Sequence, residues 1–457
     1  MLKKSKLPLL LLVVLLLVSL ACSFSAKGSK EKNDAAEPVP TSGESGTIRT
    51  APTKEMAGEP GSTSEGESAS SKSGDEVLVM NEPIYIQDDT NLVTVFMFEN
   101  TDLKAGVENI EYTIIVTDAD GAELATDYGW IDFIPAGGKT GAASKVYLME
   151  GEVADNVDIE WTYYTDAKGT DDNPFTFEKE RYFPDTYWDR FTAKMNNKSD
   201  TTYRDTRVDM IAYNAEGQIV GGGYTYVDFI PGNSSVGVSI EGFVSDDPVS
   251  YEFFPKYSDF LSIEGSEIYQ DVSIVKTGFY YEETILGGGF QVKNNTDKAI
   301  QNTIYILTIY EADGTVGQVE SGYINVLWPG EVMGVSPSWV TLSEGSAPSD
   351  FEVYVLPGDA VEDPEASNPL SVQSAEFVDD KYGDHVTVMV ANNSSVAVDD
   401  PIITVLLFNA NDEIIGGGYY FADTIEASGS FSYEVYVTNP AEEVPARIEV
   451  YVSRFSW

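Results

Sequence analysis

The chain has 457 residues, with 75 Asp and Glu against 27 Lys and Arg, which gives a formal net charge of -48. So acidic a surface repels phosphate backbones and anionic lipid headgroups, which excludes nucleic-acid binding and membrane docking through basic patches. The sequence has one His, His385, and one Cys, Cys22. Zinc sites with several His or Cys ligands are therefore excluded, and a catalytic triad is excluded unless His385 serves in it. We expect several domains, no enzyme activity, no metal and no cofactor.

Residues 1–22 have the pattern of an export signal. Lysines precede the apolar run 7–17, which is shorter than the ~20 residues of a membrane-spanning helix, and small residues follow it up to Cys22. The sequence Val-Ser-Leu-Ala-Cys at 18–22 resembles the lipobox of bacterial lipoproteins. We expect Cys22 to carry lipid chains such as palmitate and to anchor the protein to a membrane. An ordinary signal peptide with an incidental Cys is the alternative.

Residues 23–75 are rich in Ser, Gly, Glu, Pro and Lys and contain almost no large apolar side chain. Such a segment cannot bury a core, so the composition predicts a disordered tether. A flexible chain of this length reaches roughly 40 Å. Together with the lipid anchor, the tether predicts a protein of the cell envelope that is exposed on the extracytoplasmic side.

The rest of the chain repeats one unit four times. An Asn-rich turn recurs with Asn100, Asn197, Asn295 and Asn393 at spacings of 97, 98 and 98 residues. A second turn follows each of them and begins at Asp118, Asn214, Glu311 and Asn409. A third, aromatic block begins near Tyr128, Gly223, Gly322 and Gly418. Three markers in the same register indicate four copies of one fold.

Between the turns, apolar and polar residues alternate with a period of two, which is typical of half-buried β-strands. Clear examples are Leu92–Phe98, Ile110–Thr117, Thr303–Tyr310 and Ile402–Phe408. Six or seven short strands fit into each unit of nearly 100 residues, which is the size of an immunoglobulin-like sandwich. The sequence therefore predicts an all-β chain, a string of four sandwiches at 76–165, 175–258, 263–358 and 370–457.

The third unit contains Leu307–Gly314, read Leu-Thr-Ile-Tyr-Glu-Ala-Asp-Gly, between the turn Asn294–Asp297 and the corner Trp328–Glu331. These residues resemble the FxLYD-type immunoglobulin-like domain of bacterial exported lipoproteins. The second and fourth units have Tyr213-Asn214 and Phe408-Asn409 at the same place, whereas the first has Thr117-Asp118 and lacks the aromatic residue. The resemblance implies a sandwich fold and display outside the cytoplasm, and it implies no catalytic residue.

Aromatic side chains are the best candidates for a binding surface, because flat rings with a polar atom stack on sugars or anchor a protein partner. They cluster near unit edges at Trp161–Tyr164, Tyr182–Trp188, Phe253–Tyr257 and Phe279–Tyr281. We single out Tyr187 and Trp188 of the second unit as ligand-binding candidates. The alternative is that the rings fill the small cores and the contacts between units.

Other candidate sites have simpler explanations. Asp118–Glu123 begins like a calcium-binding loop but lies where every unit has a hairpin turn. Calcium between units, at 166–172 or 359–363, is the second metal alternative. The Gly221–Gly223 and Gly416–Gly418 runs indicate strand bends, because no helix follows them to form a phosphate loop. His385 begins a strand, which is typical of a surface residue.

These features predict a non-catalytic, lipid-anchored cell-surface protein that acts in adhesion or in binding a glycan or protein outside the cell. The alternatives are a structural spacer of the envelope without a specific ligand, or a non-catalytic accessory to a secreted hydrolase or transporter.

Overall fold

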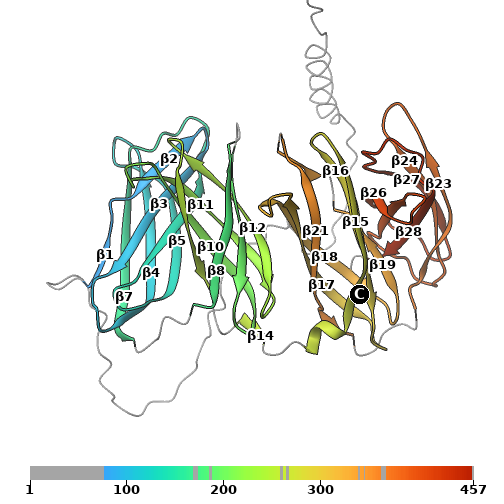
Figure 1. Cartoon of the computed structure of the whole chain (residues 1–457), viewed down its shortest axis with the longest axis horizontal. Coiled ribbons are helices and arrows are strands. Elements are labelled where there is room, and N and C mark those ends of the chain that lie inside the picture. Colours follow the sequence, from blue (N-terminus) through green and yellow to red (C-terminus); the bar gives the residue numbers. More distant parts are fainter. Residues whose placement is uncertain are drawn as a thin grey trace, which may run out of the picture. The chain divides into compact units, whose positions relative to one another are not determined.

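The computed structural model describes residues 77–167, 173–184, 188–257, 261–263, 267–337, 340–343, 345–361 and 367–454. The predicted signal 1–22, the lipidation site Cys22, the tether 23–75 and Tyr187 lie outside these residues. The described chain is all-β, as predicted, and its strands form antiparallel sheets, with one 3-10 turn, η2 (Glu267–Gln270), in the described part (Figure 1).

Each repeat contributes two groups of strands, which we call its front and back sheets. The front sheets contain, in chain order, β1 (Leu78–Met80), β2 (Ile84–Asp88), β3 (Asn91–Asn100) and β6 (Lys139–Tyr147) in repeat 1; β8 (Phe175–Phe183), β9 (Asp189–Asn197) and β12 (Ser235–Val244) in repeat 2; β15 (Val272–Glu282), β16 (Ile285–Asn294), β19 (Val332–Val335) and β20 (Val340–Thr341) in repeat 3; and β23 (Leu370–Val378), β24 (His385–Asn392) and β27 (Ser430–Tyr436) in repeat 4.

The back sheets are built around the strand that follows the Asn-rich turn. They contain β4 (Gly106–Thr117), β5 (Glu123–Ile134) and β7 (Asn156–Ala167) in repeat 1; β10 (Thr202–Tyr213), β11 (Ile219–Ile230), β13 (Ser250–Lys256) and β14 (Ser262–Ile263) in repeat 2; β17 (Ile300–Glu311), β18 (Val316–Leu327), β21 (Pro348–Leu356) and β22 (Asp359–Ala360) in repeat 3; and β25 (Ile402–Phe408), β26 (Ile414–Phe421) and β28 (Arg447–Ser453) in repeat 4. The strands predicted from alternation are thus confirmed as parts of β3, β4, β17 and β25.

An apolar cluster fills the space between the front and back sheets of each repeat. Phe96 and Phe98 lie at the centre of the first cluster, Phe191 and Phe229 in the second, Phe290 in the third, and the aliphatic side chains of β24 and β25 in the fourth. In repeat 2 the two sheets also join edge to edge, because β11 pairs with β12. The glycines Gly221–Gly223 make this possible, since a Cβ on Gly221 would lie 2.0 Å from the carbonyl oxygen of Phe243.

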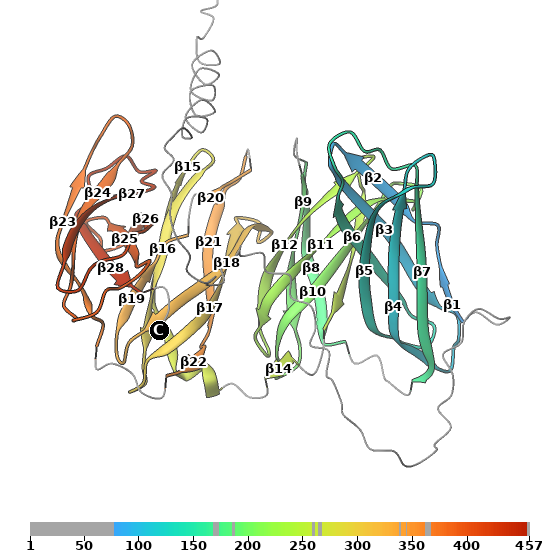
Figure 2. The ribbon, with the colours of Figure 1, turned by 180° about the vertical axis from the view of Figure 1, so that it is seen from behind.

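The back sheets of repeats 2, 3 and 4 are covered on both faces over part of their area. Their outer faces pack on the front sheets of repeats 1, 2 and 3: β10 and β11 on β6 and β3, β18 on β12 and β9, and β26 on β16 and β15. The prediction of half-buried strands is therefore wrong for β3, β17 and β25, whose side chains are nearly all buried. It is right for β4 of repeat 1, where buried and accessible residues alternate, because no other described sheet covers its outer face (Figure 2).

A buried asparagine ends the central strand of every front sheet: Asn100, Asn197, Asn294 and Asn392. In repeat 2 the Asn197 Nδ2 donates to the carbonyl oxygens of Thr201 at 2.8 Å and Pro231 at 3.1 Å, while its Oδ1 accepts from the Ser199 amide. The side chain therefore ties the front sheet to the end of the back sheet. In repeats 3 and 4 the buried asparagines Asn294 and Asn392 lie one residue before Asn295 and Asn393, the residues that mark the repeat in the sequence.

Candidate functional site

Of the two predicted ligand-binding residues, the structure describes Trp188. Its ring stacks on Phe243 of the same repeat, with centroids 4.1 Å apart, and Lys145 Nζ of repeat 1 lies 3.3 Å from the ring centroid. Trp188 therefore lies at the contact between repeats 1 and 2 and is half-buried there. Its partner in the prediction, Tyr187, lies outside the described residues.

A row of exposed aromatic side chains was not singled out from the sequence. One ring occupies the same register on the edge strand of each back sheet: Trp130 (51% exposed), Tyr226 (58%), Tyr323 (59%) and Phe421 (55%). The available signal in the sequence was the repetition of the third block. That block also contains core residues, and the sequence does not show which of its side chains are exposed and which are buried. Rings half open to solvent in all four repeats form a surface that can stack on flat apolar groups.

Two members of this row line a groove of about 580 Å³ between repeats 3 and 4. Tyr323 lies on one wall, and Tyr419 and Phe421 lie on the other, with their two rings 5.4 Å apart and nearly perpendicular. The polar lining includes Asn302, Glu320, Asn325, Ser336 and Thr404. A groove that combines aromatic walls with amide, hydroxyl and carboxyl groups has the chemistry of a small-molecule or sugar-binding site.

Two ionisable groups of the groove have shifted pKa values. Burial, together with the nearby Glu320 and Tyr419, raises the pKa of Tyr305 to about 12, so the phenol keeps its proton at neutral pH. Burial also raises the pKa of Glu320, although Gln318 Nε2 donates a hydrogen bond to its Oε1 at 3.1 Å. Glu320 is the one carboxylate among the described lining residues, so this part of the groove does not supply the paired acids of glycoside hydrolysis.

A second cluster of perturbed groups joins repeats 1 and 2. The fully buried Asp209 carboxylate lies 2.8 Å from Lys256 Nζ and 3.0 Å from Arg207, and it accepts a 2.8 Å hydrogen bond from the Ala143 amide of repeat 1. Burial alone would raise the pKa of Asp209, but Lys256 and Arg207 outweigh burial and lower it. Burial lowers the pKa of Lys256 to about 8. Because Lys256 and Arg207 both pair with the Asp209 carboxylate, we interpret this cluster as a structural contact that holds repeats 1 and 2 together.

The metal alternatives find little support in the described residues. The Asp118 carboxylate accepts hydrogen bonds from the amides of Asp120 and Ala122, so it closes the hairpin turn that Gly121 completes with a positive φ of 78°. No group of three or more metal-ligating side chains was found in the part of the chain that the structure describes. Of the two junctions, residues 168–172 and 362–363 lie outside the described residues. His385 is half-buried beside Tyr436, with ring centroids 5.6 Å apart.

In a comparison with known proteins, no family model matches the chain, and no curated protein matches it significantly. Among the described residues, none forms a helix of the length and hydropathy that crossing a bilayer requires.

Proposed function

We propose that the chain is a non-catalytic, lipid-anchored protein of the cell envelope, and that its four immunoglobulin-like sandwiches bind a glycan outside the cell. Lipidation at Cys22 and the tether 23–75 place the sandwiches on the extracytoplasmic side in this proposal. The resemblance to FxLYD-type domains supports the sandwich assignment, as do the four apolar clusters, each between two antiparallel sheets.

The aromatic groove between repeats 3 and 4 is the observation that carries glycan binding. Sugar rings present apolar C–H faces that stack on aromatic rings, and their hydroxyl groups exchange hydrogen bonds with amides and carboxylates. Tyr419 and Phe421 supply the stacking surface, while Asn302, Asn325 and Glu320 supply polar partners. The matching rings of repeats 1 and 2, Trp130 and Tyr226, would let a long polymer contact more than one repeat.

The test is affinity electrophoresis and calorimetry of residues 23–457 against a panel of polysaccharides, with and without calcium. We expect saturable binding by one class of glycan, and about tenfold weaker binding for Tyr419→Ala, the scale of a side chain that contributes about 1.4 kcal/mol. Tyr382→Ala is the matched control, because Tyr382 is 80% exposed and is not among the groove residues. Equal losses in both variants would refute the groove as the site.

Trp188→Ala separates the predicted ligand site from the structural alternative. If Trp188 binds the ligand, the substitution should lower the affinity without lowering the melting temperature. If Trp188 only holds repeats 1 and 2 together, the substitution should lower the melting temperature. It removes the ring that stacks on Phe243 and that Lys145 of repeat 1 contacts.

A spacer without a specific ligand is the second candidate. The extensive sheet-on-sheet contacts between consecutive repeats favour it, because such contacts stiffen a chain of domains. A folded protein that no polysaccharide retains would leave this as the preferred function.

A further inference from the structure

The three contacts between repeats share a glycine on the front sheet. Gly141, Gly237 and Gly334 occupy the same register, opposite Met97, Lys194 and Gln291 on the central front strand. A Cβ on Gly141 would lie 2.3 Å from Ile211 of repeat 2, one on Gly237 would lie 2.6 Å from Thr308 of repeat 3, and one on Gly334 would lie 2.3 Å from Tyr451 of repeat 4. Each glycine therefore makes the room into which the next repeat packs.

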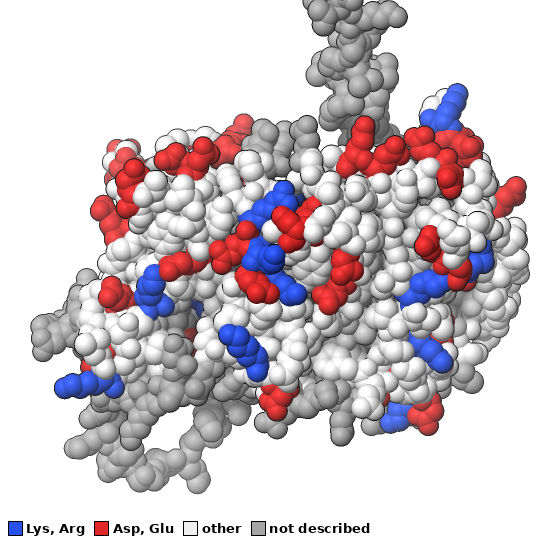
Figure 3. Space-filling model, in the orientation of Figure 1, with Lys and Arg blue, Asp and Glu red and all other residues white. Residues whose placement is uncertain are grey.

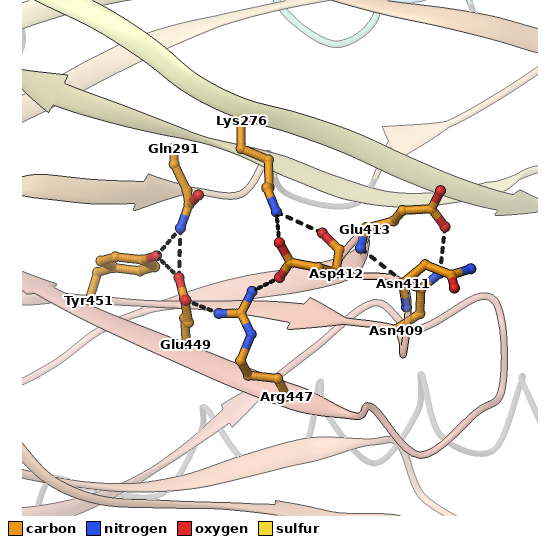
Figure 4. A network of polar contacts seen from close by, with 9 residues as sticks. All are labelled: Lys276, Gln291, Asn409, Asn411, Asp412, Glu413, Arg447, Glu449 and Tyr451. Atoms are coloured by element: carbon orange, nitrogen blue, oxygen red, sulfur yellow. Dashed lines mark hydrogen bonds and ion pairs between the residues drawn. The ribbon is translucent and has the colours of Figure 1, made fainter.

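The back sheets present a matching pair of residues. In repeats 2, 3 and 4 the central back strand carries Ile211, Thr308 and Leu406, respectively. On the strand beside it each of these residues is paired with an acid, in the same order Glu252, Glu352 and Glu449. Front-sheet residues reach two of these acids, since Lys139 binds Glu252 at 2.7 Å and Gln291 donates to Glu449 at 2.6 Å. Figure 4 shows the contact between repeats 3 and 4, where Lys276 also pairs with Asp412 beside Arg447.

Repeat 1 keeps both residues of this pair. Ile115 stands at the position of Ile211, and Asp158 stands opposite it at the position of Glu252. Around them the outer face of the back sheet exposes Tyr128, Trp130 and Tyr164. No other described sheet covers this face, although the same face is covered in repeats 2, 3 and 4.

The front sheet of repeat 4 has lost the complementary features. Ser432 takes the place of the glycine, opposite Met389. Exposed acids flank it at Glu376 and Glu434, where repeat 2 has Arg181 and Ser239. At the contacts of repeat 1 with repeat 2 and of repeat 3 with repeat 4, front-sheet lysines pair with acids, Lys139 with Glu252 and Lys276 with Asp412. Figure 3 shows several Lys and Arg among Asp and Glu on one face of the molecule. The front sheet of repeat 4 would instead bring acids to the acidic face of repeat 1, so a second copy of the chain is a poor occupant.

We propose that the outer back-sheet face of repeat 1, centred on Ile115 and Asp158, is a docking site for a partner protein that presents a basic antiparallel sheet with a glycine at its centre. Docking at this face would repeat the contact that the chain forms three times between its own repeats. The basic side chains would again come from the front sheet and the acids from the back sheet. It does not depend on the glycan groove between repeats 3 and 4, although Trp130 belongs both to this face and to the row of exposed rings.

The test converts repeat 4 into such a partner and uses a second copy of the chain as the probe. The variant E376R/S432G/E434S copies Arg181, Gly237 and Ser239 of repeat 2 onto repeat 4, where Thr387 already matches Thr192. We expect wild-type 23–457 to sediment as a monomer. The variant should associate head to tail, and its average mass should rise with concentration and exceed twice the monomer mass near 0.5 mM protein, since sheet-on-sheet interfaces of standard size bind in the micromolar range or more tightly.

Adding Ile115→Arg to the variant should return it to the monomer, because it removes the apolar contact and repels the grafted arginine. If the triple variant does not fold, as judged by circular dichroism, S432G/M389K is the second form of the test, with the lysine copying Lys194. A folded variant that stays monomeric would overturn the proposal. So would oligomers that survive Ile115→Arg, or a wild-type chain that already associates.

Discussion

The four buried asparagines act as side-chain clamps between the two sheets of each repeat. Asn392 is 2% exposed, and its Nδ2 donates to the carbonyl oxygens of Val396 at 2.7 Å and Ile425 at 3.0 Å. Its Oδ1 accepts from the amide of Ser394 at 2.9 Å. One side chain therefore bonds backbone groups of the turn 394–396 and of Ile425, which lies 33 residues further along the chain.

Replacing this clamp should destabilise repeat 4 strongly. Asn392→Ala removes the hydrogen bonds of a buried side chain and leaves the Ser394 amide without its acceptor, whereas the Val396 and Ile425 carbonyls keep donors in Ser394 Oγ and the Val398 amide. An unpaired group costs ~1–3 kcal/mol, so we expect a loss of about 1–3 kcal/mol in the free energy of unfolding. Urea unfolding followed by circular dichroism measures it. Asn393→Ala is the control, because Asn393 is exposed and should cost less than about 1 kcal/mol. Equal losses would show that the clamp is not the source of stability.

The Asp209 cluster makes stability depend on pH in a defined direction. The pKa of Asp209 lies below its unfolded value, so its ion pairs contribute stability above about pH 4, and this contribution is lost as pH falls through the lower folded value. We expect Asp209→Asn to lose about 3–5 kcal/mol at pH 7, because Lys256 and Arg207 are left buried without the carboxylate. The difference between wild type and variant should shrink below pH 4. A difference that is independent of pH from 7 to 3 would contradict this assignment.

At the scale of single elements, burial depends on what lies beyond the repeat. Strand β4 alternates between buried and accessible residues, whereas in β25 all residues after the first are buried, because β25 faces repeat 3 on one side and its own core on the other. The sequence carries a signal that the expectation of alternation overlooked: β25 reads Ile-Ile-Thr-Val-Leu-Leu-Phe, in which Thr404 is the one polar residue. Strand positions were therefore predictable, but the partner of the second face was not, because that contact is long-range.

The candidate site was less predictable than the strands. Trp188 stood out as a large aromatic residue near a linker, yet its ring is stacked on Phe243, while Tyr323 and Phe421 looked like ordinary members of a repeated strand. Alternation indicates which side chains share a face, but it does not indicate whether a neighbouring repeat covers that face. The groove needs residues of both repeat 3 and repeat 4 and so has no signature within one repeat.

The glycine on each covered front strand should resist substitution. A Cβ on Gly237 would lie 2.6 Å from Thr308 and 2.7 Å from Val319, so Gly237→Val should cost about 1–3 kcal/mol through overpacking between repeats 2 and 3. Ser432→Val, at the same register on the uncovered sheet of repeat 4, should change stability by less than about 0.5 kcal/mol. Thermal unfolding of both variants makes the comparison, and a similar loss at the two positions would contradict the packing argument.

At the scale of the whole molecule, the repeats should not unfold as four independent units. Each back sheet of repeats 2 to 4 buries its outer face on the preceding repeat, so unfolding one repeat exposes apolar surface of its neighbour. We expect the ratio of calorimetric to van 't Hoff enthalpy of residues 23–457 to lie well below four. Four independent transitions, or a ratio near four, would show that the contacts between repeats contribute little to stability.

The serine at the glycine position of repeat 4 limits how such a chain can lengthen by duplication. A copy of repeat 2 or 3 inserted between existing repeats would carry Gly237 or Gly334 toward the next copy and would be accepted on both sides. A copy added after repeat 4 would meet Ser432 and the acids Glu376 and Glu434 instead. In arrays of this architecture, a repeat with glycine at this position should therefore accept a following repeat, and a repeat with serine and flanking acids should not.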